Sequence, residues 1–172
     1  DLRLRPGDNG IRRRVVDKIK TTEGDLIVRD ARFAIVASRF NDFIVESLLK
    51  ASLRCLRQHG AVDADVEIVR VPGAFEMPLM VDKLAGSRRY DGIIALGCVI
   101  RGGTPHFDYV AGECVKGISA ASSRHGVPTG FGILTVDSIE QAIERAGTKA
   151  GNKGEEATLA VIEMVNTLRH VE

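Results

Sequence analysis

Short apolar runs alternate along this chain with segments whose apolar residues recur every three or four positions. The runs are rich in β-branched residues, and they cover residues 32–38, 66–71, 92–100 and 130–136. Alternation of this kind is typical of a parallel sheet that helices cover on both faces through right-handed crossovers. We therefore predict an α/β fold, a three-layer α/β/α sandwich around a four-stranded parallel sheet.

The segments between the runs predict the helices. Asn41 or Asp42 is the expected cap of the first helix and Gly60 its end, while Ser138 and Gln141 have the spacing of a capping box. The expected helices cover residues 41–60, 74–85, 106–126 and 138–147, with a last one from about residue 155. The chain shows no internal repeat and no linker.

Composition limits the class of protein. The 172 residues, 44% hydrophobic and 27% charged, fit one globular domain with a real core and exclude a disordered chain. A net charge of +1 gives no whole-chain field that would hold a nucleic acid or an anionic membrane. The basic excess in residues 1–20 predicts a flexible, solvated extension over residues 1–25 before a domain at 26–172, with nucleic-acid binding as the alternative.

The cysteines and the apolar segments indicate in which cellular compartment the protein is expected. Cys55, Cys98 and Cys114 are far apart and odd in number, which argues against a disulfide framework or a zinc site. No run approaches the roughly 18 apolar residues of a membrane span, and the first residues lack the apolar core of a secretory signal. We expect a cytoplasmic enzyme or binding module without membrane contact.

Ligands of open parallel sheets bind beyond the carboxyl ends of the strands, so the four strand-to-helix junctions form one candidate site. Phe40, between two polar residues, can be a core plug, or it can stack on a planar ligand. Glu76, expected in the first turn of a helix, can favour the helix dipole or contact a ligand. Gly102 and Gly103 can form a tight turn, or their amides can hold an anion.

His106 is the histidine that is placed for chemistry, because it lies at the expected start of a helix. The positive end of the helix dipole there favours the neutral imidazole, which keeps a nitrogen free to accept a proton. Asp108 or Glu113 can orient the ring, and no serine or cysteine nucleophile accompanies it. We expect general acid/base chemistry without a covalent step.

The other three histidines have plainer interpretations. His59 and His125 each precede a glycine that ends a helix, where an imidazole can bind the terminal carbonyl groups. His170 lies in the C-terminal tail and follows no pattern.

The stretch "ERAGTKAGNKGEE" concentrates positive charge among glycines. It does not fit the nucleotide-binding P-loop, because the spacing is wrong and a helix, not a strand, precedes it. Lys149 fits a solvated loop, whereas Arg145 and Lys153 have glycine amides beside them and can also clamp a substrate phosphate.

Five stretches, "RFND", "VPGAFEMP", "LGCVIRGGTPHFDYV", "GFGILT" and "IEQAIERAGTKAGNKGEEA", resemble those of the 6,7-dimethyl-8-ribityllumazine synthases, which act in riboflavin biosynthesis. The likeness spans about residues 31–169 and implies a flavodoxin-like fold. It implies condensation of 5-amino-6-ribitylaminouracil with 3,4-dihydroxy-2-butanone 4-phosphate. Phosphate and water are released, without a metal or an organic cofactor.

The resemblance also assigns roles to residues. It implies that Phe40 stacks on the pyrimidine and that His106 transfers protons. The remaining implied contacts are the ribityl side at Ala74, Phe75 and Glu76, the ring at Cys98, Val99 and Ile100, and the phosphate at Gly103 and Thr104. Arg145 is the implied phosphate clamp and Phe131 an aromatic wall, both from a neighbouring subunit, and Lys153 is a basic group near the substrates.

The family's assembly is implied as well. Its members form homopentamers, in many cases closed into an icosahedral shell, and the short "GTKAGNKG" connection resembles the shell-forming members. The apolar segment Leu26 to Arg29 lies outside the four-strand order, so we expect it not to be needed in its own core and to add to a neighbour's sheet. The basic extension can crowd the contacts between rings, and riboflavin synthase is a further implied partner.

One alternative class uses the same scaffold. A flavin- or lumazine-binding carrier, or a shell protein without catalysis, would be expected to lose His106 or Arg145. Both are present, which favours the enzyme.

Overall fold

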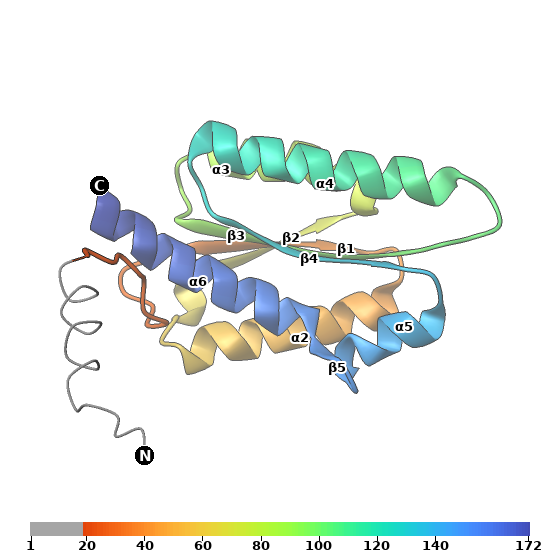
Figure 1. Ribbon diagram of the computed structural model, residues 1–172, viewed down its shortest axis with the longest axis horizontal. Helices are drawn as coiled ribbons and strands as arrows, with labels where there is room; N and C mark the ends of the chain where they lie inside the picture. Colours follow the sequence, from red (N-terminus) through yellow and green to blue (C-terminus); the bar gives the residue numbers. More distant parts are fainter. Residues whose placement is uncertain (1–18) are drawn as a thin grey trace, which may run out of the picture.

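The computed structural model describes residues 19–172. Its centre is a four-stranded sheet in the order β2-β1-β3-β4 (Figure 1). The strands are β1 (Phe33–Ser38), β2 (Val66–Val71), β3 (Gly92–Ile100) and β4 (Thr129–Val136). All three pairings are parallel, which confirms the predicted sheet.

Helices cover both faces of the sheet, as predicted (Figure 1). One face carries α2 (Asp42–Gln58), α5 (Ile139–Glu144) and α6 (Lys153–Val171). The other carries α3 (Met77–Gly86) and α4 (His106–His125). The chain also contains two 3₁₀ turns, η1 (Asp63–Asp65) and η2 (Ala74–Glu76), and a small hairpin of β5 (Ala146–Thr148) and β6 (Gly151–Asn152).

Burial on both faces explains why the two central strands, β1 and β3, consist almost entirely of apolar residues. Every residue of β1 is buried, and every residue of β3 is buried except Ile100. Two hydrophobic clusters form the core, one under each helical layer. Gly130 allows α6 to lie close to β4, because a Cβ there would come within 2.5 Å of the Ala157 carbonyl oxygen.

The helix ends differ from the sequence predictions in three places. Asn41 precedes α2 without a capping side-chain bond, and its backbone is left-handed with φ 60°. The stretch predicted as one helix from Ala74 begins with the 3₁₀ turn η2, which contains Glu76, and continues directly into α3. The glycine-rich loop folds as the β5–β6 hairpin, and Asn152 caps α6 two residues earlier than expected. The predicted cap is confirmed at α5, where the Ser138 side chain accepts from the Gln141 amide.

The histidines expected at helix ends have other partners. His59 Nδ1 lies 2.7 Å from the carbonyl oxygen of Leu26, and His125 Nε2 lies 2.9 Å from Asp82 Oδ1. Both rings therefore connect separate segments, and the predicted bonds to the terminal carbonyls of their own helices are wrong. His170 belongs to the last turn of α6 and not to a tail.

The segment before β1 is attached to its own subunit. The Gly24 amide donates to Thr167 Oγ1, the Asn166 side chain donates to the carbonyl oxygens of Asp25 and Ile27, and Val28 packs against the core. The expectation that this segment is not needed in its own core is therefore wrong for Val28. The predicted flexibility of the extension falls mostly on residues 1–18, which lie outside the described residues. Within residues 19–172, no helix has the length and apolar character that a bilayer crossing requires.

Candidate active site

The candidate site lies where the order of the strands reverses. The connection that follows β1 leads to β2 on one side, whereas β3 pairs with β1 on its other side. The junctions after β1 and β3 therefore diverge and leave a crevice at the carboxyl ends of the strands. A cavity of about 180 Å³ occupies this position.

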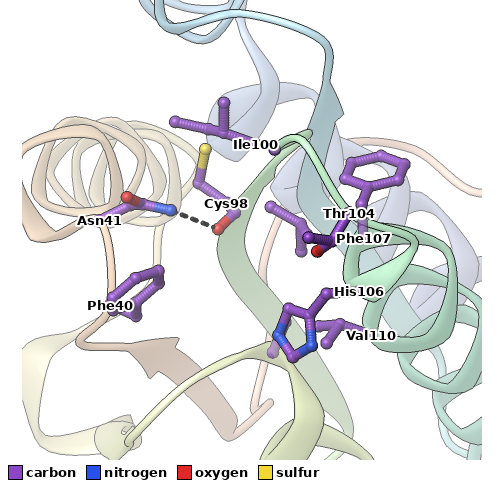
Figure 2. A pocket seen from close by; sticks show the side chains of 11 residues that line it. Phe40, Asn41, Cys98, Ile100, Thr104, His106, Phe107 and Val110 are labelled. Atoms are coloured by element: carbon purple, nitrogen blue, oxygen red, sulfur yellow. Dashed lines mark hydrogen bonds between the residues drawn. The ribbon is translucent and has the colours of Figure 1, made fainter.

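The walls of the cavity come from four separate stretches of the chain (Figure 2). Phe40 and Asn41 lie on one side, Thr104, His106 and Val110 lie on the other, and the end of β3 lies between them. The lining residues are Phe40, Asn41, Ala74, Cys98, Val99, Ile100, Gly102, Thr104, His106, Phe107 and Val110.

A second, wider hollow of about 560 Å³ adjoins the first. Phe75 and Glu76 line it, together with Pro72, Gly73 and Tyr109. The two hollows share Phe40, Ala74, His106 and Val110. They form two compartments of one elongated site, and His106 lies at the boundary between them.

Phe40 is available for stacking. Phe40 is 72% exposed and borders both compartments. A phenylalanine this accessible contributes little to a core. The interpretation as a core plug is therefore wrong. An exposed aromatic ring at a cavity mouth suits the face of a planar heterocycle.

Asn41 fixes the wall that carries Phe40. Its Nδ2 donates a hydrogen bond of 2.9 Å to the Cys98 carbonyl oxygen, which joins the junction after β1 to the end of β3. The left-handed backbone costs most residues roughly 1–2 kcal/mol, and asparagine tolerates it better than most. The sequence predicted only a capping role for Asn41, because its partner is 57 residues away.

The junction between β3 and α4 combines an anion-binding geometry with His106. His106 is the first residue of α4, as predicted, and it is exposed. Gly102 and Thr104 line the cavity, and a Cβ on Gly102 or Gly103 would meet no atom within 4 Å. Exposed backbone amides before a 20-residue helix suit a phosphate group.

Gly103 lies between the lining residues Gly102 and Thr104 without lining either compartment itself, and three other predicted site residues lie farther away. Phe131 projects from β4 into a separate groove beside α4. Arg145 follows α5, with its guanidinium 3.1 Å from the Gln141 carbonyl oxygen and 3.5 Å from Glu144. Lys153 begins α6, where its Nζ pairs with Glu156 at 2.6 Å. The single chain therefore brings together the residues after β1, β2 and β3, and these three remain apart from them.

The cysteines are buried thiols. Burial raises the pKa of Cys98 to about 11, and the pKa values of Cys55 and Cys114 rise to about 11 for the same reason. These thiols are protonated at neutral pH, so the Cys98 side chain in the cavity wall is not a nucleophile. Among residues 19–172, no three His, Cys, Asp or Glu side chains gather as metal ligands would.

Several lining residues had no role in the sequence analysis. Phe107 is almost fully buried, and Tyr109 is exposed beside His106 in the wider compartment. Val110, one helical turn after His106, borders both compartments. Residues three and four positions apart lie on the same face of a helix. The position of His106 at the start of a helix could therefore have indicated that Tyr109 and Val110 line the site as well.

The comparisons with known proteins agree with this geometry. The family model described as 6,7-dimethyl-8-ribityllumazine synthase matches residues 30–169. A curated protein of Nitratidesulfovibrio vulgaris (strain DSM 19637 / Miyazaki F), named 6,7-dimethyl-8-ribityllumazine synthase, is 59% identical over 153 residues, which are 89% of this chain and 98% of that protein. The match with the family model includes every strand and helix that lines the two compartments. The chain belongs to the 6,7-dimethyl-8-ribityllumazine synthase family.

Proposed function

We propose that the chain catalyses the reaction for which its family is named. It condenses 5-amino-6-ribitylaminouracil with 3,4-dihydroxy-2-butanone 4-phosphate and releases phosphate and water, as a transferase of riboflavin biosynthesis. The observation that carries this proposal is the arrangement of Phe40, His106 and the glycine junction around one cavity at the switch point of the sheet.

Each compartment suits one part of the pyrimidine substrate. In the smaller cavity, Phe40 stacks on the ring, and the backbone at Cys98, Val99 and Ile100 contacts its edge. The ribityl chain then extends into the wider compartment beside Ala74, Phe75 and Glu76. The exposed Glu76 carboxylate can accept hydrogen bonds from the hydroxyl groups of that chain.

The phosphorylated substrate belongs at the start of α4. The amides of Gly103 and Thr104 hold its phosphate, which places the four-carbon chain near His106. Loss of water and of phosphate both require protons to move, and His106 lies between the two compartments. Most of the acceleration comes from holding the two substrates together, and proton transfer supplies a smaller factor.

A neighbouring subunit completes the site in this proposal. Arg145 supplies a phosphate clamp, Phe131 supplies an aromatic wall, and Lys153 adds a positive charge. Support comes from their positions on β4, directly after α5 and at the start of α6, outside the compartments of their own chain. The assembly is a homopentamer, and the short β5–β6 connection favours closure into an icosahedral shell.

The proposal extends to the domain boundary, the segment before β1, a partner protein and the location in the cell. The domain begins near residue 26, and the segment Leu26 to Arg29 adds to a neighbour's sheet through backbone groups other than those that Asn166 and His59 bind in its own chain. Riboflavin synthase as a partner and a cytoplasmic location also remain predictions.

Lumazine formation tests the function. The protein mixed with both substrates should produce the fluorescent lumazine faster than the spontaneous reaction in the same buffer. A rate equal to the spontaneous one, with lumazine still bound, would favour the alternative of a carrier without catalysis.

A further inference from the structure

Arg101 lies at the end of β3, next to the glycine junction, and the proposed function gives it no role. Its Nε donates to Asp137 Oδ1 at 2.9 Å, and its Nη1 donates to Asp108 Oδ1 at 3.2 Å. Its guanidinium carbon lies 4.2 Å from the centre of the Phe107 ring. One side chain therefore contacts two carboxylates and an aromatic face.

These contacts link the two ends of the junction, and we call the set of Arg101, Phe107, Asp108 and Asp137 the bracket. Phe107 and Asp108 belong to the first turn of α4, and Asp137 follows β4. The Arg101 amide also donates to the Val136 carbonyl oxygen at 2.8 Å. Arg101 thus joins the end of β3, the start of α4 and the end of β4.

The junction inside the bracket has little other support. Residues 102–105 are all exposed, and open space surrounds the Cα atoms of Gly102 and Gly103 on the side where a Cβ would project. Glycine has a wide choice of backbone conformations, so the fixed ends determine the shape of this stretch. Arg101 holds both ends.

The strength of the bracket comes from its combined contacts. A single exposed ion pair contributes little to stability, and networks of charges are the exception to that rule. Here the planar guanidinium binds two carboxylates while its face lies on Phe107. The two carboxylates raise the pKa of Arg101, which keeps the guanidinium charged.

The bracket continues toward Arg145. The Asp137 amide donates to Gln141 Oε1 at 2.8 Å, and the Arg145 guanidinium donates to the Gln141 carbonyl oxygen at 3.1 Å. Asp137, the anchor of Arg101, is therefore also connected to the Arg145 that this chain supplies to a neighbour's site in the proposed function.

We propose that Arg101 is a positioning residue for phosphate recognition, which holds the junction of Gly102 to Pro105 in its anion-binding shape through Phe107, Asp108 and Asp137. This inference rests on the proposed function and deepens it. Arg101 acts through these neighbours and does not itself touch the substrate.

The test compares Arg101→Gln, Arg101→Lys and Asp137→Asn with the wild type. We expect Arg101→Gln to raise the KM for the phosphorylated substrate about tenfold, because a misplaced binding group costs up to about 100-fold. The KM for the pyrimidine should change little. The KM of Arg101→Lys for the phosphorylated substrate should lie between those of the wild type and Arg101→Gln, because an ammonium keeps the charge but lacks the planar pair of donors of a guanidinium.

Two further variants make the result specific. Arg57→Gln is the control, because Arg57 makes a somewhat more exposed pair with Asp63 at the far end of α2, and it should leave both KM values unchanged. The double variant Arg101→Gln/Asp137→Asn should be no worse than the more affected single variant, because both changes open the same bracket.

Direct binding of inorganic phosphate provides a readout besides activity. Calorimetry should show weaker phosphate binding by Arg101→Gln than by the wild type, at an unchanged melting temperature. An unchanged phosphate affinity and KM, or equal weakening of both substrates with a lowered melting temperature, would overturn the positioning role. An inactive wild type would instead refute the proposed function, and the phosphate measurement would still decide the role of Arg101.

Discussion

His106 borders both compartments at the start of α4, which is where a proton carrier between two substrates has to be. His106→Ala should slow turnover by about 10- to 100-fold, because the substrates are still held together when the base is lost. Steady-state fluorescence with both substrates saturating measures this. Complete loss of turnover with normal substrate binding would mean that His106 does more than transfer protons.

Arg145 provides a different prediction at the residue scale. A guanidinium binds phosphate through two parallel hydrogen bonds, which an ammonium cannot reproduce. Arg145→Lys should raise the KM for the phosphorylated substrate and leave binding of the pyrimidine nearly unchanged. Titration of each substrate at a saturating level of the other separates the two effects, and equal weakening of both would exclude a phosphate clamp.

Sequence reasoning found the residues whose local setting is distinctive. Phe40 follows a strand, and His106 precedes a helical pattern, so both could be placed on one edge of the sheet. Asn41 and Arg101 were missed as structural links because their partners Cys98 and Asp137 are 57 and 36 residues away. Contacts at that separation depend on the register of the strands, which no local pattern contains.

At the scale of elements, α6 holds the segment that leads into β1. Asn166 is 6% exposed, and its Nδ2 lies within 3.1 Å of three oxygens of Asp25 and Ile27. Asn166→Ala should cost about 1–3 kcal/mol by removing these bonds from a buried position. Hydrogen exchange should show faster exchange in residues 24–30, with β1 and β3 unaffected, and unchanged exchange in residues 24–30 would contradict this attachment.

The same attachment has a predictable dependence on pH. A hydrogen bond from Arg29 lowers the pKa of Asp25 from 3.8 to about 2. A lowered carboxyl pKa stabilises the folded state above the ordinary value, and this contribution is lost as the pH falls from 3.8 towards 2. The Asp25–Arg29 ion pair within the segment is therefore formed throughout the neutral range.

The large elements were predictable because their patterns are long and two-sided. The four strands and five helices agree with the apolar runs and helical spacings to within a few residues at each end. The β5–β6 hairpin was not predicted, because its strands of three and two residues are too short to show an alternation. Glycine and lysine in that stretch favoured a loop, and pairing between Ala146 and Asn152 overrides that preference.

At the scale of the whole molecule, Phe131, Arg145 and Lys153 line neither compartment of their own chain, so the proposed site needs a second subunit. Light scattering during size exclusion at neutral pH should show a species of megadalton scale if the pentamers close into a shell, as proposed. A mass near five chains of 18.6 kDa would limit the assembly to single rings. A stable, active monomer would refute the shared site.

The central claim is that each catalytic site combines His106 of one subunit with Arg145 of its neighbour, and co-assembly of two variants tests it most directly. Pure assemblies of His106→Ala and of Arg145→Ala should each turn over more slowly than the wild type. The phosphorylated substrate is kept below the KM that Arg145→Ala has for it. In rings co-assembled at equal amounts, about a quarter of the sites should contain both native residues and recover wild-type turnover. Mixed rings that are no more active than the average of the two pure assemblies would show that both residues serve the site of the same chain, which contradicts the account.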